Sequence, residues 1–280
     1  MNLMQKIAIG SIRLKFSIIS LFSGKLAARA AFQLFCTPQL RNRKTPPPIF
    51  DEAEDLELVH KGNLLRGFRW NKGAEKKVLI VHGFESTVLN FENYIQPLMD
   101  KGYEVLAFDA MAHGRSEGKT INILQYQEML QQIDAVYGPI RSFVAHSFGG
   151  LTTTLYLESI VHDNTYRLVL IAPATETTTA IDQFFAIMKL HKGIRREFDR
   201  LIENIGGHKP DWFSIRRAAP FLKAQVLFLQ DTKDAMTPYS DVIPLMDQKL
   251  PNFRFLISEG LGHRRIYRDE KSSKAVIDFL

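Results

Sequence analysis

A short segment around Ser147 constrains this chain more than any other part of its sequence. Residues 145–150 (AHSFGG) join an apolar run, residues 142–145, to a segment with helical spacing that starts at Leu151. A serine at such a strand-to-helix turn is raised clear of the sheet, and only small neighbours let the chain bend so tightly. The segment therefore predicts an accessible nucleophile, Ser147, at the edge of a sheet.

Strand-like and helix-like segments alternate along the chain from about residue 56. The predicted strands are 56–60, 64–70, 78–81, 104–108, 142–145, 168–171, 226–229 and 253–257, and the clearest helices are 91–101, 123–137 and 271–280. The first two strands resemble a hairpin, and continuous apolar runs such as 78–81 are typical of parallel strands buried on both faces. This order predicts an α/β fold with a mainly parallel eight-stranded sheet and helices on both faces.

An insertion interrupts this alternation. About 50 residues separate the end of strand 168–171 from strand 226–229, whereas such connections usually have about 2–6 residues. The insertion has apolar residues at helical spacing and follows the carboxyl end of a strand, where ligands of parallel sheets bind. We therefore expect a helical cap at 173–222, a core at 51–172 and 223–280, and an N-terminal arm at 1–50. A helical decoration that buries only its own apolar face is the alternative.

The arm is basic, whereas the rest of the chain is not. Residues 1–50 hold eight of the 36 Lys and Arg residues and no acid, which leaves 28 basic against 30 acidic residues elsewhere. Arg13 and Lys15 interrupt the apolar residues of the arm, so no spanning helix is expected. The arm can form a basic amphipathic helix that packs on the body or rests on an anionic membrane, a secretory signal cleaved near Ala30, or a frayed tail. We expect a packed or membrane-surface helix, a cytoplasmic protein with peripheral membrane contact, and a stiff linker at 45–48 (TPPP).

The composition and the motifs exclude several classes of site. The core has no basic face with interleaved aromatic residues, so no nucleic-acid binding is expected. Cys36 is the one cysteine, and no Cys/His group has the spacing of zinc ligands, so we expect neither a disulfide nor a metal. Residues 114–120 (GRSEGKT) resemble a phosphate loop, but three residues rather than four separate the two glycines. An ATPase is therefore not expected.

Two later segments supply the partners that a serine nucleophile needs. A serine hydroxyl is a weak nucleophile at neutral pH and requires a base that a third group orients. Asp234 and His263 each follow a predicted strand, so both are expected at the carboxyl edge of the sheet. The chain order Ser147, Asp234, His263 is that of one hydrolase architecture. Asp231 stays a second candidate for the acid.

Two backbone amides are candidates for an oxyanion hole. The N–H of Phe148 starts the helix after the serine, and the N–H of Phe84 follows the strand 78–81 in the segment His82-Gly83-Phe84. Loss of one such donor costs about 2.7–4 kcal/mol of transition-state stabilisation. His82 is expected to support this loop by hydrogen bonds rather than to react.

Taken in order, these motifs resemble those of the α/β-hydrolase family, in particular its capped esterase, lipase and serine-peptidase-like branch. The matching pieces cover the chain from about residue 55 to 280 and are residues 82–84, 108–116 (FDAMAHGRS), 145–150, Asp234 and 262–263. Alanine at 145 stands where the family usually has glycine, and Asp231 stands where it often has glycine.

The resemblance implies a nucleophile, an acid and a base at Ser147, Asp234 and His263, and oxyanion donors at Phe84 and Phe148. It also implies a reaction without metal or organic cofactor. We therefore expect a serine hydrolase that cleaves a small-molecule carboxylic ester through an acyl-enzyme. An amidase or peptidase, a carbon–carbon bond hydrolase, and a non-catalytic binding protein on the same scaffold are the alternatives.

Overall fold

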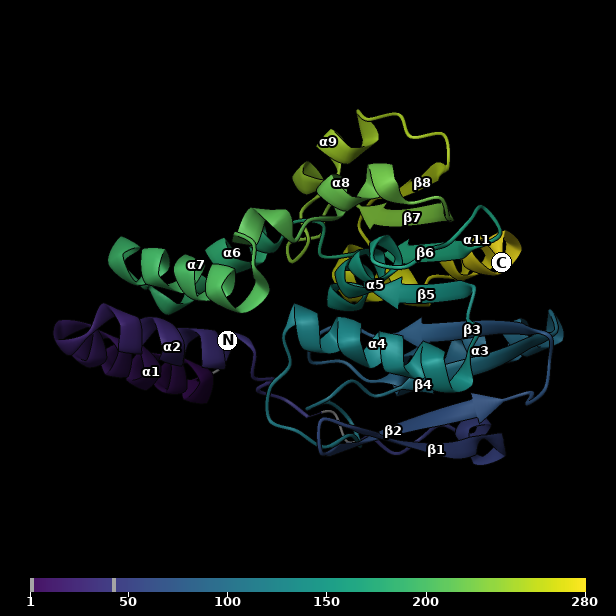
Figure 1. Ribbon diagram of the computed structural model, residues 1–280, viewed down its shortest axis with the longest axis horizontal. Helices are drawn as coiled ribbons and strands as arrows, with labels where there is room; N and C mark the ends of the chain where they lie inside the picture. The colour runs from purple at the N-terminus through teal and green to yellow at the C-terminus, as the bar shows by residue number, and fades with distance from the viewer. Residues whose placement is uncertain (1–2, 42–43) are drawn as a thin grey trace. The chain divides into compact units, whose positions relative to one another are not determined.

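The computed structural model describes residues 3–41 and 44–280 of the 280-residue chain (Figure 1). The chain divides into two compact units. The helical unit comprises Met1–Thr37 and Glu176–Phe213, and the sheet unit comprises Pro38–Thr175 and Ser214–Leu280. Arg43, one of the eight basic residues of the arm, lies outside the described residues.

The sheet unit is built on one eight-stranded sheet with the strand order β1-β2-β4-β3-β5-β6-β7-β8. Strand β2 is antiparallel to β1 and β4, and the other neighbouring pairs are parallel. The strands are β1 (Glu54–His60), β2 (Asn63–Trp70), β3 (Lys76–Val81), β4 (Tyr103–Phe108), β5 (Ser142–His146), β6 (Arg167–Ile171), β7 (Gln225–Asp231) and β8 (Phe253–Ser258). The predicted mainly parallel eight-stranded sheet is therefore confirmed.

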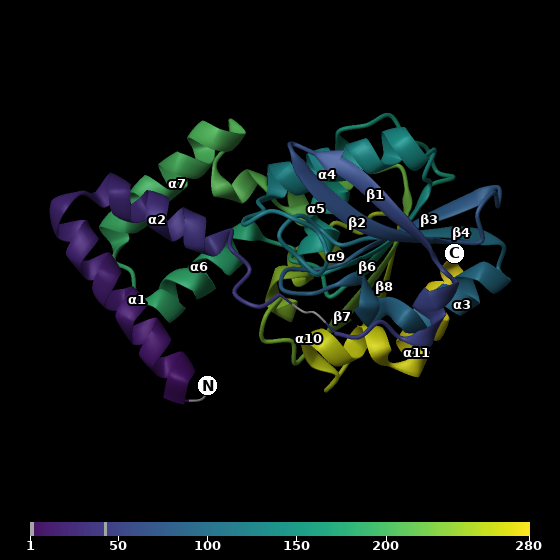
Figure 2. The same ribbon diagram turned by 90° about the horizontal axis from the view of Figure 1, so that it is seen from below.

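Helices cover both faces of this sheet, as Figures 1 and 2 show. Helices α4 and α5 lie on one face, and α3 and α11 lie on the other. The helices of the sheet unit are α3 (Glu92–Asp100), α4 (Ile123–Tyr137), α5 (Phe148–Glu158), α8 (Ile215–Ala218), α9 (Ile243–Met246), α10 (Gly262–Arg265) and α11 (Glu270–Phe279). Because both faces are covered, every residue of β4 and β5 is buried.

The sequence predicts the long elements more closely than the short ones. Helix α4 has the bounds predicted for it, because a capping box between Asn122 and Gln125 begins it and Gly138 ends it. Helices α8, α9 and α10 have four residues each, which is too short for an apolar period to be read. Strand β7 continues to Asp231, two residues beyond the predicted end, because Gln230 and Asp231 still pair with β8.

The helical unit consists of α1 (Leu3–Phe22), α2 (Gly24–Phe35), α6 (Thr177–Met188) and α7 (Lys192–Gly206). Helix α2 presents three buried alanines, Ala27, Ala28 and Ala31, and packs closely against α7. The rings of Phe32 and Phe35 lie edge-on to Phe198, with centroids 5.7 and 5.8 Å apart. The arm as far as Thr37 and residues 176–213 of the insertion thus share one core, whereas residues 38–50 of the expected arm belong to the sheet unit.

Helix α1 joins this core through a polar contact and a buried ring. The guanidinium of Arg13 donates to the carbonyl oxygen of Ile187 at 2.7 Å, which satisfies a carbonyl near the C-terminus of α6. Phe16 is buried on the same helix. Across residues 3–41 and 44–280, no helix combines the length and the apolar character that a bilayer crossing requires.

The last nine residues of the predicted insertion, 214–222, fold with the sheet unit. The N–H of Ile215 donates to the carbonyl oxygen of Thr175 at 2.9 Å, and Ser214 caps α8. Arg217 forms an ion pair with Glu158 at the end of α5. That the rest of the insertion acts as a cap stays a prediction.

Candidate active site

Ser147 occupies a strained turn between β5 and α5. Its backbone has φ 54° and ψ −123°, a conformation that costs a residue other than glycine about 1–3 kcal/mol. Hydrogen bonds hold it there: its N–H donates to Ile171 at 3.1 Å, and its carbonyl oxygen accepts the N–H groups of Gly150 and Ala174 at 2.9 and 3.0 Å. The turn directs the side chain out of the sheet, as the segment 145–150 predicts.

Two glycines allow the chain to approach this turn closely. A Cβ atom at Gly83 would lie 2.7 Å from the Cβ of Ser147, and a Cβ at Gly149 would lie 2.5 Å from the carbonyl oxygen of His82. Either contact is too short for a side chain, so both positions require glycine. As a result the loop after β3 lies directly against Ser147.

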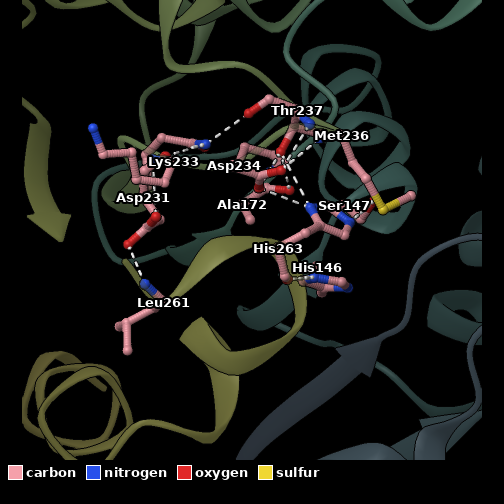
Figure 3. Close-up of polar contacts among 12 residues, drawn as sticks. His146, Ser147, Ala172, Asp231, Lys233, Asp234, Met236, Thr237, Leu261 and His263 are labelled. Atoms are coloured by element: carbon pink, nitrogen blue, oxygen red, sulfur yellow. Dashed lines mark hydrogen bonds and ion pairs between the residues drawn. The ribbon is translucent and has the colours of Figure 1, made fainter. Parts of the chain in front are cut away.

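The structure brings the three predicted triad residues together (Figure 3). The Oγ of Ser147 lies 3.0 Å from Nε2 of His263, and Nδ1 of His263 lies 2.8 Å from Oδ2 of Asp234. The carboxylate can only accept, so Nδ1 carries the proton and Nε2 is free to accept from the serine hydroxyl. The side chains of His263 and Asp234 are 8% and 0% exposed, so water competes little for this contact.

Asp234 is held as an anion by several donors. Its Oδ1 accepts the N–H groups of Met236 and Thr237 at 2.8 and 3.0 Å, and its Oδ2 accepts the Thr237 hydroxyl at 2.7 Å. Burial opposes ionisation, but the hydrogen bond and charge of His263 and the donors of Thr237 outweigh it and hold the pKa of Asp234 below its usual range. Asp234 can therefore stabilise a positive charge on His263.

Asp231 has a different set of partners and does not occupy the place of the acid. Its carboxylate accepts the N–H of Lys233 at 2.9 Å and the N–H of Leu261 at 2.9 Å (Figure 3). It also accepts the hydroxyl of Ser258 at 2.8 Å. Burial opposes its charge, yet these donors keep the pKa of Asp231 below its usual range. Asp231 thus fixes the loop that leads from β8 to His263.

The amides of Phe84 and Phe148 are both available beside the turn. Phe148 is the first residue of α5, so its N–H has no acceptor within the helix. Over the described residues, neither amide donates a backbone hydrogen bond. The two rings lie edge to face with centroids 6.0 Å apart, which holds the two chain segments together.

Two neutral histidines fix the loop that carries Phe84. Nε2 of His82 accepts the N–H of Ala110 at 2.8 Å, and Nε2 of His113 accepts the N–H of Glu85 at 2.9 Å. Each ring has its Nδ1 within 3.0 Å of a nearby carbonyl oxygen, to which it donates. Burial lowers the pKa of both, that of His113 to about 3, so each ring nitrogen Nε2 stays an acceptor at neutral pH. The sequence indicated the supporting role of His82 but not that of His113.

His146 holds the backbone of His263 and was not singled out by the sequence. Its Nε2–H donates to the carbonyl oxygen of His263 at 3.0 Å, and its ring lies edge-on to Tyr267 with centroids 4.7 Å apart. Burial, together with the nearby His263, lowers the pKa of His146 to about 3, so this ring is neutral. In the described part of the chain, no three His, Cys, Asp or Glu side chains are grouped to hold a metal ion.

These buried histidines predict a loss of stability in acid. Between about pH 3 and pH 6.5 the unfolded chain binds protons that the folded His113 and His146 do not, so stability is full above this window and falls as the pH drops through it. Each ring contributes a slope of up to about 1.4 kcal/mol per pH unit. We expect His113→Gln to lower that slope, measured by urea unfolding at several pH values between about 7 and 5.

The exposed His208 offers the matched control for this experiment. His208→Gln replaces an exposed ring instead of a buried one, and the slope measured for His113→Gln is compared with the slope of this variant. Equal slopes for the parent chain and His113→Gln would show that His113 is not kept neutral by the fold.

Comparisons with known proteins agree with this fold. The uncharacterized protein YqkD of Bacillus subtilis strain 168 is 23% identical over 225 residues, which cover 72% of this chain and 70% of that protein. The esterase Pf2001 of Pyrococcus furiosus has 20% identity and a TM-score of 0.63, over 88% of this chain and 95% of that one. A monoacylglycerol lipase of Paleococcus ferrophilus has 20% identity and a TM-score of 0.58, over 76% and 97%. At these identities the solved structures establish the fold.

A family model adds the assignment that these structures do not give. The model described as serine aminopeptidase, S33, matches residues 72–226, which is more than half of the chain and includes β3 to β6 and the turn at Ser147. The chain therefore belongs to the serine aminopeptidase S33 family of α/β hydrolases.

Proposed function

We propose that this chain is a serine hydrolase that cleaves carboxylic esters through an acyl-enzyme. Ser147 is the nucleophile, His263 the general base and Asp234 the acid that orients it. The observation that carries the proposal is the continuous chain of hydrogen bonds from Ser147 Oγ through His263 to Asp234, at 3.0 and 2.8 Å. Ser147 lies at a turn, and its positive φ directs the side chain away from the sheet.

The geometry supports a two-step acyl transfer. As Oγ of Ser147 attacks the ester carbonyl carbon, its proton passes to Nε2 of His263, and Asp234 stabilises the resulting imidazolium. The carbonyl π electrons move onto the oxygen, and the N–H groups of Phe84 and Phe148 stabilise that oxyanion. The tetrahedral intermediate then collapses. The bond from the carbonyl carbon to the leaving oxygen breaks, and that oxygen takes the proton from Nε2 of His263 and leaves as the alcohol. Water then cleaves the acyl-enzyme with His263 again acting as the base.

An ester substrate is supported by the similar structures, an esterase and a monoacylglycerol lipase. The apolar residues of the insertion do not add to this argument. Phe184 and Phe185 pack against Phe198 within the helical unit, with ring centroids 6.3 and 5.2 Å apart, so they serve its own core. The preferred acyl length is therefore to be measured with a series of p-nitrophenyl esters of increasing acyl length.

A peptidase is the second candidate, because the family model is described as a serine aminopeptidase. An aminopeptidase must pair the ammonium group of its substrate with a carboxylate, since an unpaired buried charge is costly. Glu85 directly follows Phe84 and is the nearest acid in the sequence to that amide. Its Oε1 accepts the N–H of Gln39 at 2.8 Å, which leaves the second carboxylate oxygen as an acceptor, so the choice between ester and peptide is made by experiment.

A serine-directed fluorophosphonate should label the parent chain at Ser147 and fail to label Ser147→Ala. Hydrolysis of a p-nitrophenyl ester should fall in the variant by about 10⁶-fold, the loss seen when the nucleophile of a serine protease is removed. Mass spectrometry of the labelled peptide and initial rates measure the two effects.

Ser116 is the control serine, because its hydroxyl is buried and donates to the backbone of Asp109 at 2.5 Å. Ser116→Ala should keep the label. Label that persists in Ser147→Ala would exclude Ser147 as the nucleophile.

Substitution of Asp234 and of Asp231 should affect kcat to different extents. Asp234→Asn removes the acceptor for Nδ1 of His263 and should lower kcat by up to about 10⁴-fold, by analogy with the serine-protease aspartate. Asp231→Asn keeps one oxygen for the loop and should lower kcat far less, with a lower temperature of unfolding. The reverse order in kcat would make Asp231 the acid.

A matched pair of esters distinguishes the esterase from the aminopeptidase. The p-nitrophenyl esters of propionate and alanine have the same acyl length and differ by an amino group. For an esterase, kcat/KM should be at least as high for the propionyl ester. A preference of about tenfold or more for the alanyl ester, abolished in Glu85→Gln, would instead favour the aminopeptidase.

A further inference from the structure

The helical unit has an apolar surface that its own core does not use. Five large apolar side chains of α1 and α2 are exposed by about half or more: Leu14 (63%), Ile18 (49%), Leu21 (83%), Phe22 (84%) and Leu26 (55%). At about 100° per residue, the four on α1 fall within an arc of about 100°, and the buried Phe16 lies on the opposite side of the helix. The stripe is therefore one face of α1.

This stripe differs from the other exposed apolar residues of the chain. Val161 in the sheet unit is 98% exposed, and no large exposed apolar residue lies within a helical turn of it in sequence. Single exposed apolar residues are normal, whereas a contiguous patch marks a surface that binds an apolar partner. Leu21 and Phe22, the most exposed of the five, stand together at the corner where α1 ends.

The corner is held firmly by the fold. The side chain of Ser23 caps α2 through the N–H of Leu26 at 3.3 Å, and the N–H of Ser23 donates to Ile19 of α1 at 3.0 Å. Ala27 and Ala28, directly beyond the cap, are buried in the core of the helical unit. The exposed corner is thus mounted on a packed helix, and ordering it on a partner costs little additional entropy.

The charge around the corner selects the partner. Lys15 and Lys25 are exposed next to Leu14 and Leu26, and the first 50 residues carry eight basic side chains and no acid. The helical unit as a whole has 11 Lys and Arg residues against six Asp and Glu residues. A second copy of this face would bring like charges together, whereas an anionic surface complements them.

We propose that the corner between α1 and α2 docks on an anionic lipid surface. Leu21 and Phe22 enter the acyl-chain boundary, and Lys15 and Lys25 lie at the level of the headgroup phosphates. The helix rests in the interface and does not cross it, because no described helix of the chain has the length and apolar character to do so. The proposal is independent of the reaction at Ser147.

Co-sedimentation of the full chain with vesicles tests this surface. Binding to vesicles of equal parts phosphatidylcholine and phosphatidylglycerol should exceed binding to phosphatidylcholine alone and should weaken as salt is raised. Leu21→Ser with Phe22→Ser should reduce binding by at least about tenfold. Lys25→Ser alone should reduce it by about fivefold, the equivalent of ~1 kcal/mol.

Val161→Ser is the matched control, since it removes an equally exposed apolar side chain from the sheet unit. It should bind vesicles as the parent chain does, and circular dichroism should show that all variants fold. As a second readout, the fluorescence of Phe22→Trp should shift to the blue on anionic vesicles, whereas that of Val161→Trp should not.

Two results would overturn the proposal. One is equal vesicle binding by the parent chain and the Leu21→Ser, Phe22→Ser variant, which would mean that the corner does not enter the lipid. The other is a dimer in solution that the same double substitution dissociates, without any binding of the parent chain to anionic vesicles. That outcome would assign the face to a second copy of this chain.

Discussion

The positive φ of Ser147 is the constraint on which the rest of the site depends. A serine does not keep this backbone conformation without support, because it costs about 1–3 kcal/mol. The support comes from the carbonyl of Ile171, from the N–H groups that reach the serine carbonyl, and from Gly83, whose missing side chain lets the neighbouring loop close on the turn. The same contacts that hold the strain bring the amide of Phe84 beside Ser147. Presentation of the serine and the approach of the Phe84 amide, a candidate oxyanion donor, therefore have one structural cause.

The loops around this turn are fixed by three histidines that must stay neutral and two aspartates that must stay ionised. His82, His113 and His146 work as acceptors or donors only as neutral rings, and their burial keeps them so. Asp231 and Asp234 work only as anions, and their donors keep them so despite burial. All five groups have the required protonation state near neutral pH. As the pH falls, the stability that depends on the histidines is lost first, since the histidines of the unfolded chain begin to bind protons near pH 6.5.

The sequence predicted the sheet and the residues that meet at its edge, because long apolar runs and their order carry that information. It could not separate the two aspartates by geometry, since the choice depends on how far β7 pairs with β8. Two further pairs, Gln230 with Ile257 and Asp231 with Ser258, keep Asp231 in the sheet and leave Asp234 beyond its edge. The roles of His113 and His146 also lacked a local signal, because their partners are backbone groups 28 and 117 residues away.

The packing of the N-terminal arm could not be predicted either, because its partner is far away in the sequence. Helix α7 has an apolar face with Phe198 at its centre. Residues of the neighbouring α6 cover part of this face, and the others come from α2, more than 160 positions earlier in the chain. The apolar period of either helix does not identify the other helix as its partner. The sequence therefore left four alternatives for the arm: packing on the body, membrane contact, a cleaved signal and a frayed tail. Once α2 is part of that core, its buried alanines are needed by the insertion as much as by the arm. The segment entering the insertion is itself bonded to the site, through Ala174 to Ser147 and Ala172 to Thr237. The chain enters the helical unit directly after this anchored segment, at Glu176.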